Sequence, residues 1–321
     1  MANLPASIEI KEEGPREGFQ YEKGQIPTQR KIELIDALSQ TGLRHIATVS
    51  FVDPRRVPGM ADAEAVVNGM TPNPDVTYSA LALNKRGLER ALATGRVRVG
   101  GAILLVTTEA FVKINLNRSK AEQLAAQPAM IQLLKEHHLP IESIGIMAAF
   151  GCNYEGPVTT RCVLDLISDA LGVAAEHDLT IRRINLADTM GWATPLQIKR
   201  LVGAVQDRFP EIEVMLHLHD TRGMGIANAF AGLEMGVRRF DAAVAGLGGC
   251  PFAHNKGAAG NVCTEDLVFM CEEMGVETGV DLDALIECAI LAEDVVGHPL
   301  PGSVKIGGSL RRLREKLVPA A

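Results

Sequence analysis

An α/β protein built as a (β/α)₈ TIM barrel with a C-terminal helical cap is predicted by the 321-residue sequence. Short apolar runs alternate with segments of helical spacing, which is typical of parallel strands joined by crossover helices. Eight such runs are present, and eight units close into a barrel more naturally than they form an open sheet. The hydrophobic fraction of 47% includes only 4% aromatics, so we expect a core of Ala, Val, Leu and Ile, as suits strands covered by helices.

The apolar runs give the order of the elements. Strands are expected at 7–13, 45–51, 76–83, 97–106, 143–151, 183–189, 213–220 and 239–248. Helices are expected between them at 28–41, 61–68, 85–94, 119–138, 159–177, 195–208 and 224–235. Helical patterns after Thr264 and after Leu282 would follow the eighth strand and cover the barrel. Because no repeat or low-complexity linker interrupts the chain, we expect one domain over 1–321, with the barrel at about 7–262 and the cap at about 263–321.

Charge and cysteine content narrow the classes of function. A net charge of −7 without a long charge run does not favour a surface for nucleic acid. The six cysteines show neither a CxxC pair nor zinc-ligand spacing, so we expect reduced thiols in a cytoplasmic protein. No apolar run approaches the ~20 residues of a membrane span, and we expect neither a signal peptide nor a membrane partner.

Residues that follow the strands are the candidates for chemistry, because TIM-barrel active sites lie where strands end and βα loops begin. The first strand runs into EEGPREGFQ, which contains Arg16, Glu17 and Gln20. The seventh ends in LHLHDT, where alternation puts His217 and His219 on one face. Two imidazoles so spaced can chelate Zn, Mn, Fe or Co. With Glu17 across the barrel mouth, they predict a His₂–carboxylate metal site with open positions for substrate.

The eighth strand runs into the glycine-rich segment AGLGGCP. Its glycines permit close backbone approach and would present Cys250 at the catalytic end, where a nearby charge can tune a thiol for acid–base work. An inert buried cysteine is the alternative. Asn261 follows, and its amide oxygen could complete an oxygen-rich metal site.

Three further candidates follow the fifth and sixth strands. Asp188 and Thr189 stand in LADTMG at the end of the sixth strand, where a carboxylate indicates function. Tyr154 lies in FGCNYEG after the fifth strand, either as a hydrogen-bond donor at the rim or as loop packing.

In their order along the chain, these motifs resemble those of the 3-hydroxy-3-methylglutaryl-CoA lyases, a family of metal-dependent barrel lyases. The matching stretches extend from about Ile8 to Pro299 and are GPREGFQYEK, TVSFVDPRRVPGMAD, FGCNYEG, ADTMGWATP, HLHDTRGMGIAN and AGLGGCPFAHNKGAAGNVCTEDLV. Each motif is modest alone, but the ordered set is specific.

The resemblance implies a carbon–carbon lyase that cleaves a 3-hydroxyacyl-CoA to acetyl-CoA and a keto acid. Mg²⁺ or Mn²⁺ would be held by Glu17, His217, His219 and Asn261. Arg16 would stabilise the enolate, Cys250 would exchange a proton, Asp188 and Tyr154 would assist near the reacting hydroxyl, and Gln20 and Thr189 are assigned to substrate binding. We further expect an acyl-CoA substrate, a homodimer or homotetramer, and no nucleic-acid partner.

Three departures from the family pattern concern the substrate. The relatives have Asp where this chain has Glu17 and Glu where it has Ala47, and the stretch from Cys250 to Asn261 is two residues longer here. Together they should favour an acid whose carboxylate lies nearer the metal, such as that of citramalyl-CoA. Glu17→Asp combined with Ala47→Glu should then restore a preference for hydroxymethylglutaryl-CoA.

Two other functions stay open. A synthase would run the same chemistry in the condensing direction, although the chain has no long C-terminal regulatory domain. A barrel that has lost catalysis could serve as a binding subunit, which the loss of a carboxylate at Ala47 favours slightly. The retained Arg16, His217 and His219 favour an enzyme.

Overall fold

Eight parallel strands form one curled sheet in the computed structural model, which describes residues 4–22, 24–249 and 259–317. The strands are β1 (Glu9–Glu12), β2 (His45–Ser50), β3 (Thr77–Leu81), β4 (Gly101–Val106), β5 (Ile141–Met147), β8 (Arg183–Ala187), β9 (Glu213–His217) and β10 (Arg239–Ala242). Their order is β3-β2-β1-β10-β9-β8-β5-β4. A parallel bridge between Ser79 and Arg98 joins β3 to the segment before β4, which confirms the predicted barrel.

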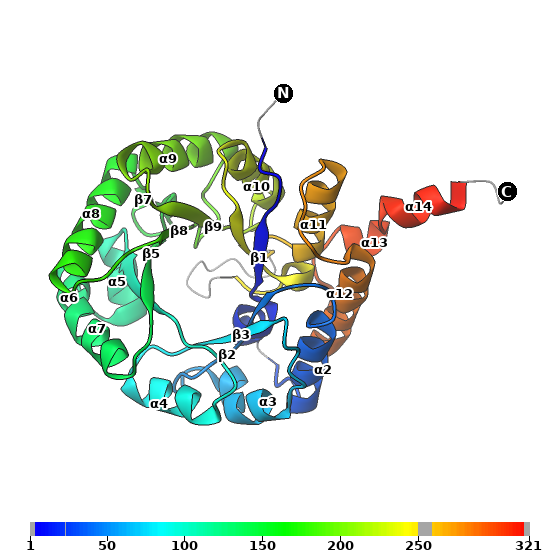
Figure 1. Cartoon of the computed structure of the whole chain (residues 1–321), viewed down its shortest axis with the longest axis horizontal. Coiled ribbons are helices and arrows are strands. Elements are labelled where there is room, and N and C mark those ends of the chain that lie inside the picture. The colour runs from blue at the N-terminus through cyan, green and yellow to red at the C-terminus, as the bar shows by residue number, and fades with distance from the viewer. Residues whose placement is uncertain (1–3, 23, 250–258, 318–321) are drawn as a thin grey trace.

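Helices surround the strands as an outer ring (Figure 1). They are α2 (Thr28–Leu38), α3 (Ala63–Gly69), α4 (Lys85–Thr94), α5 (Glu109–Leu116), α6 (Lys120–Ala125), α7 (Gln127–Glu136), α8 (Thr160–Glu176), α9 (Pro195–Arg208) and α10 (Gly225–Glu234). The helix expected at 119–138 is in fact two, because a proline at position 128 opens a second helix with its fixed φ and missing N–H. Helix α5 was not predicted at all.

Several strands end earlier than their apolar runs predicted. After β5, Ala148 has a positive φ of 53°, and the chain turns into the short hairpin of β6 (Gly151–Cys152) and β7 (Gly156–Pro157). After β10, Ala245 has a φ of 56° within the 3₁₀ turn η3 (Val244–Gly246). The left-handed region ends strand pairing, and an apolar composition does not reveal it.

The first strand leads into a feature that periodicity did not predict. A five-residue π-helical turn, η1 (Gly14–Gly18), follows β1 and continues into the short helix α1 (Phe19–Tyr21). Arg16 and Glu17 lie on this turn, and π-helical turns are often found at functional sites.

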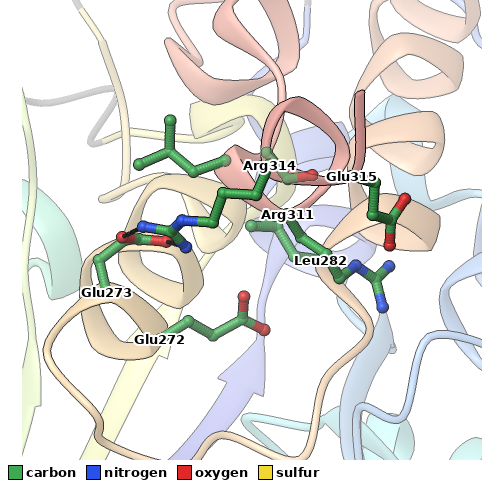
Figure 2. A pocket seen from close by; sticks show the side chains of 8 residues that line it. Glu272, Glu273, Leu282, Arg311, Arg314 and Glu315 are labelled. Carbon is green, nitrogen blue, oxygen red and sulfur yellow. Dashed lines mark hydrogen bonds and ion pairs between the residues drawn. The ribbon is translucent and has the colours of Figure 1, made fainter. Parts of the chain in front are cut away.

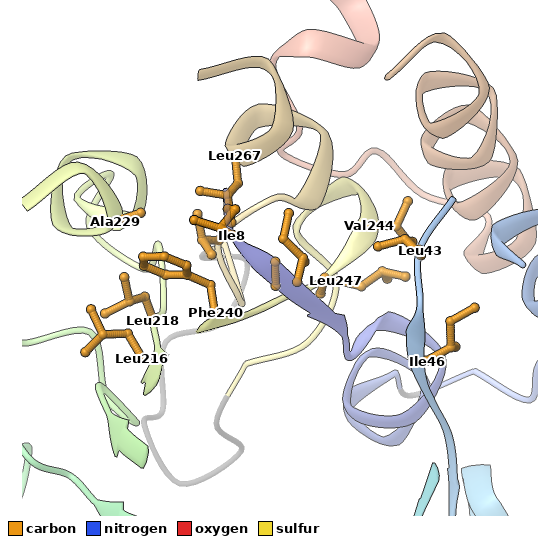
Figure 3. Close-up of a cluster of buried hydrophobic side chains, with 14 of the residues drawn as sticks. Ile8, Leu43, Ile46, Leu216, Leu218, Ala229, Phe240, Val244, Leu247 and Leu267 are labelled. Atoms are coloured by element: carbon orange, nitrogen blue, oxygen red, sulfur yellow. The ribbon is translucent and has the colours of Figure 1, made fainter. Parts of the chain in front are cut away.

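The strands pack their outer faces against the helices. Figure 3 shows Leu216, Leu218 and Phe240 side by side near α10. A Cβ on Gly232 of α10 would lie 2.6 Å from Leu216 Cδ1, so the glycine allows the helix to approach the sheet closely. Leu216 and Phe240 are fully buried in this layer.

The inner face of the barrel is polar near the site. The register pairs Lys11 with Asp241 and Asp241 with His217, so these three side chains lie on the same face of β1, β10 and β9. The sheet thus places charged groups in a row that leads to the ends of the strands.

Helices follow the barrel, as the sequence predicted for the cap, and within the described residues they are α11 (Thr264–Glu273), α12 (Leu282–Val296), α13 (Val304–Gly307) and α14 (Leu310–Leu317). The first two are the helices expected after Thr264 and Leu282, and the last two were not predicted individually. These helices lie together at one side of the ring, and α14 extends away from it (Figure 1). The expected boundaries of barrel and cap within a single domain stay a prediction. In the described part of the chain, no helix has the length and apolar character needed to cross a membrane.

Candidate metal centre and active site

The predicted metal ligands come from three places at the carboxyl end of the barrel. Glu17 lies on η1 after β1, His217 is the last residue of β9, and His219 follows two residues later. Asn261 pairs with His219 through an antiparallel β-bridge. Parallel strands share one carboxyl end, so Glu17, the two histidines and Asn261 meet there although they come from distant parts of the sequence.

Glu17, His217 and His219 form a cluster of potential metal ligands. Their donor atoms all lie within 4.8 Å of one another. Glu17 Oε1 is 3.3 Å from His219 Nε2 and 3.7 Å from His217 Nε2. The two Nε2 atoms face each other at 3.1 Å. Two nitrogen lone pairs at this distance repel unless a proton or a cation lies between them, and the set of two imidazoles and one carboxylate is one that a divalent metal ion can bind.

Asn261 adds an unsatisfied oxygen to the same place. The side chain is fully buried, and its Nδ2 donates to Glu17 Oε1 and to Leu247 O, both at 3.1 Å. Its Oδ1 accepts no hydrogen bond from any described residue. An unpaired buried carbonyl oxygen costs about 1–3 kcal/mol, which a cation ligated by it would offset.

Asp241 orients His217 from behind. Its Oδ2 lies 2.9 Å from His217 Nδ1, which leaves Nε2 directed at Glu17. Burial opposes a charge on His217, but Glu17 and Asp241 outweigh it and raise the pKa of His217 to about 10. A carboxylate on the far nitrogen of a ligating histidine is a usual feature of metal sites. Asp241 was not among the residues predicted from the sequence, although an aspartate inside the apolar run of β10 was a signal for it.

Arg16 stands beside the cluster, held by two carboxylates. Its Nε donates to Glu13 Oε2 at 2.8 Å, its Nη2 also pairs with Glu13, and Nη2 is 3.3 Å from Glu17 Oε2. Lys11 Nζ binds the other oxygen of Glu13 at 2.6 Å. Ala47 carries no carboxylate, but Glu13, directly after the neighbouring strand β1, supplies one, a feature not predicted from the sequence.

Asp188 is buried close to the two histidines. Its Oδ1 accepts the backbone N–H groups of Trp192 at 2.7 Å and Ala193 at 3.0 Å. Its Oδ2 has no partner among the described residues, and burial raises the pKa of Asp188 despite the nearby His219. The neighbouring Thr189 is also buried, and its hydroxyl oxygen accepts from Ala148 N at 2.8 Å, so it ties the end of β8 to the end of β5.

Tyr154 and Gln20 lie in loops at the same end of the strands. Tyr154 is partly buried and packs against the small apolar cluster of Val106, Phe111, Val112, Ala148, Cys152 and Met190. Gln20 accepts a hydrogen bond from the Ser50 hydroxyl at 2.8 Å. The roles assigned to these two residues stay predictions.

The glycine-rich segment packs directly on the cluster. Gly248 has a φ of +100°, and a Cβ there would lie 2.5 Å from Asn261 Nδ2 and 3.3 Å from Glu17 Cγ. Cys250, predicted as the acid–base thiol, lies outside the described residues. Close backbone approach was the expected use of these glycines, and Gly248 has it.

A separate surface pocket lies between α11 and α14 (Figure 2). Its lining includes Glu272, Glu273, Arg311 and Arg314, and Arg314 pairs with Glu273 at 2.7 Å. None of the candidate site residues lines it, so we do not assign the chemistry to this pocket.

Comparison with known proteins gives a consistent result. A family model described as HMGL-like matches residues 7–291. The cytoplasmic 3-hydroxy-3-methylglutaryl-CoA lyase of Mus musculus is 39% identical over 89% of this chain and 80% of its own length. The hydroxymethylglutaryl-CoA lyase YngG of Bacillus subtilis is 38% identical over 92% of this chain and 96% of its own length.

Solved structures show the same relationship. An HMG-CoA lyase from Acinetobacter baumannii, in complex with coenzyme A and 3-methylmalate, matches with a TM-score of 0.84 and 37% identity over 96% of this chain and 97% of that one. The HMG-CoA lyase of Bacillus subtilis matches with a TM-score of 0.85 and 36% identity over 95% and 99%. The chain therefore belongs to the HMGL-like family.

Proposed function

We propose that the protein is a divalent-metal-dependent carbon–carbon lyase that cleaves a 3-hydroxyacyl-CoA of the hydroxymethylglutaryl-CoA type to acetyl-CoA and a keto acid. The observation that carries this is the convergence of Glu17, His217 and His219 beside Arg16, in a chain of the HMGL-like family. Carbon–carbon cleavage needs a stabilised alkoxide and a stabilised enolate, and these residues offer a group for each.

The metal would be held by Glu17, His217, His219 and Asn261, with Mg²⁺ or Mn²⁺ as the ions proposed. When bound, such an ion supplies Lewis-acid chemistry that lowers the pKa of a substrate hydroxyl. Asp241 keeps the ligating nitrogen of His217 turned toward the site. Gly248 lets the chain pass without displacing Glu17 or Asn261.

Chain residues account for the rest of the reaction. Asp188, buried and with one unpaired oxygen, would exchange the proton of the substrate hydroxyl. As the Cα–Cβ bond breaks, its electron pair moves into the thioester and forms an enolate, and Arg16 offers a fixed positive charge to that oxygen. Cys250 would return a proton to Cα, which gives acetyl-CoA.

A shorter acid is the second candidate substrate. In citramalyl-CoA the carbinol carbon carries its carboxylate directly, and the same is true of the 3-methylmalate in the Acinetobacter baumannii relative. Glu17 has one methylene more than the family's aspartate and could fill the space that a shorter substrate leaves. Cleavage would then release pyruvate.

We predict that Glu17→Asp shifts the ratio of kcat/KM between citramalyl-CoA and hydroxymethylglutaryl-CoA toward the longer substrate. One methylene is worth ~10–200-fold in discrimination, so the shift should lie in that range. Assays of both citramalyl-CoA enantiomers and hydroxymethylglutaryl-CoA, with the keto acid identified, measure it. A wild type that already prefers hydroxymethylglutaryl-CoA leaves no role for the shorter acid and supports the first candidate.

We further propose an acyl-CoA substrate held at this end of the barrel, a cytoplasmic enzyme and a homo-oligomeric assembly. The absence of a membrane-spanning helix among the described residues and the cytoplasmic relative from Mus musculus are consistent with this setting. Fractionation of cells tests the compartment, and light scattering of the purified protein tests the oligomeric state.

A further inference from the structure

A chain of alternating charges runs from the barrel interior to the cluster of ligands. Lys11 binds Glu13, Glu13 binds Arg16, and Arg16 reaches Glu17. The Glu13 side chain is only 1% exposed. Each of its oxygens meets a different cation, Oε1 meeting Lys11 and Oε2 meeting Arg16. The mechanism above uses Arg16 and Glu17 but gives Glu13 no task.

Glu13 fixes the plane of the Arg16 guanidinium. It engages both Nε and Nη2, and such a two-nitrogen contact defines the orientation of the group as well as its position. The backbone of Glu13 anchors the same turn, because its carbonyl accepts the N–H groups of Arg16 at 3.1 Å and Glu17 at 2.7 Å. Glu13 therefore fixes Arg16 in two ways, through its side-chain carboxylate and through its backbone carbonyl in the turn.

Without this carboxylate, Arg16 would have Glu17 as its nearest anion. The two already approach to 3.3 Å, and a guanidinium released from Glu13 would pair fully with Glu17. That pairing would extend from Glu17 Oε2, which Arg16 already contacts, to Oε1, the oxygen that faces the histidines. It would also turn the positive charge away from the place where an enolate forms.

We propose that Glu13 is the positioning residue for Arg16: it holds the guanidinium off Glu17, so that Glu17 remains free to bind the metal and Arg16 remains free to meet the thioester. The role of Arg16 toward the thioester rests on the proposed function. The effect on metal binding by Glu17 does not, and it can be measured without turnover.

Ala47 offers a way to move the carboxylate. The β1–β2 register pairs Lys11 with His45 and Glu12 with Ile46, so it reaches Glu13 and Ala47 at the next step. Ala47 is buried, and alternation places it on the same face of the sheet as His45 and Lys11. A glutamate at 47 could therefore supply, from the neighbouring strand, what Glu13 supplies from β1.

The test is a double-mutant cycle on Mn²⁺ affinity, measured by electron paramagnetic resonance for wild type, Glu13→Gln, Arg16→Met and the double variant. We expect Glu13→Gln to weaken Mn²⁺ binding about 10–100-fold, as for other residues that support metal ligands. In the Arg16→Met background the same change should cost less than about twofold, since no guanidinium is left to capture Glu17. Glu9→Gln on the exposed side of β1 is the matched control and should change nothing.

Turnover supplies the second measurement. Glu13→Gln should lower kcat much more than it changes KM for the acyl-CoA. Adding Ala47→Glu to this variant should raise its kcat at least tenfold. Unchanged Mn²⁺ affinity in Glu13→Gln, or an equal loss with and without Arg16, overturns the positioning role. If the wild type binds Mn²⁺ and the two substitutions show the expected coupling, but the protein cleaves no 3-hydroxyacyl-CoA, the proposed function is overturned. The effect of Glu13 on metal binding by Glu17 is then still supported.

Discussion

Four side chains converge on the carboxylate of Glu17. Asn261, His219 and Arg16 lie 3.1, 3.3 and 3.3 Å from its oxygens, and His217 lies at 3.7 Å. Burial disfavours the charged carboxylate, but His217, His219 and Arg16 outweigh it and hold the pKa of Glu17 well below its usual range. The site therefore presents an anionic oxygen where a cation would bind.

Arg16→Met should remove turnover and leave the fold intact, because methionine keeps much of the volume and deletes the charge. Loss of one preorganised donor at a developing oxyanion typically costs ~10²–10³ in rate. Steady-state kcat and a thermal unfolding curve measure the two parts. Arg200→Met, on the exposed face of α9, serves as the control. A loss below about tenfold would leave Arg16 with a structural role only.

The candidate ligand residues could be proposed from the sequence, whereas the residues that support them could not. The spacing of His217 and His219 at the end of an apolar run indicates a pair of metal ligands. Glu17 and Asn261 also follow strands, where active-site residues of this fold lie. Glu13 and Asp241 owe their roles to register, because Lys11–Asp241 and Asp241–His217 are neighbours only once β1, β10 and β9 pair. A single sequence does not contain that register.

Among the elements, the connections between strand and helix matter most for the site. Strand order followed from alternating periodicities, but the π-helical turn η1 that carries Arg16 and Glu17 had no periodic signal. The early end of β10 also depends on one left-handed residue, Ala245. These features depend on the backbone dihedral angles of single residues, which a hydrophobic pattern does not predict.

Gly248→Ala should weaken Mn²⁺ binding about 10–100-fold, the scale of defects beside metal ligands. The added Cβ would meet Asn261 Nδ2 at 2.5 Å, and φ of +100° is unfavourable for alanine. Gly275→Ala is a matched control, since Gly275 has a φ of +74° with open space around its Cβ. Equal effects of the two substitutions on Mn²⁺ affinity would mean that backbone strain, and not contact with the ligands, is responsible.

Two buried carboxylates accept hydrogen bonds from the backbone at the start of the glycine-rich segment. Glu12 accepts from Val244 N at 2.9 Å, and Glu265 accepts from Ala245 N at 2.9 Å. Burial raises the pKa of Glu12 to about 7 and that of Glu265 to about 8. The folded protein therefore binds protons at these groups that the unfolded chain has already released at neutral pH.

Glu265→Gln should make the free energy of unfolding less sensitive to pH. Because the folded-state pKa of Glu265 is raised from 4.5 to about 8, its contribution to stability is fully present below about pH 4.5 and is lost as pH rises through about 8. The variant should therefore gain stability relative to wild type as pH rises from about 5 to about 8, measured by urea denaturation. Glu176→Gln, exposed on α8, is the control. A constant difference across this range would show that Glu265 does not titrate in the folded protein.

For the whole molecule, the barrel gathers residues from both ends of the chain into one place. Glu17 and Asn261 are 244 positions apart, yet they form one hydrogen bond, because β1 and β10 are neighbours in the closed sheet. The closed barrel was predictable from the count of alternating elements. The pairing across its interior was not, since it follows from the polar face that β1, β9 and β10 share.

Metal dependence of cleavage is the most direct test of the proposed lyase activity. Purified protein is stripped with EDTA, then assayed for acetyl-CoA release from hydroxymethylglutaryl-CoA and citramalyl-CoA before and after Mg²⁺ or Mn²⁺ is restored. We predict that stripping abolishes cleavage, that either ion restores it, and that a protein with His217→Ala and His219→Ala neither binds Mn²⁺ nor regains activity. Full activity in the stripped protein, or in the protein without both histidines, would show that cleavage does not need a metal ion at this site.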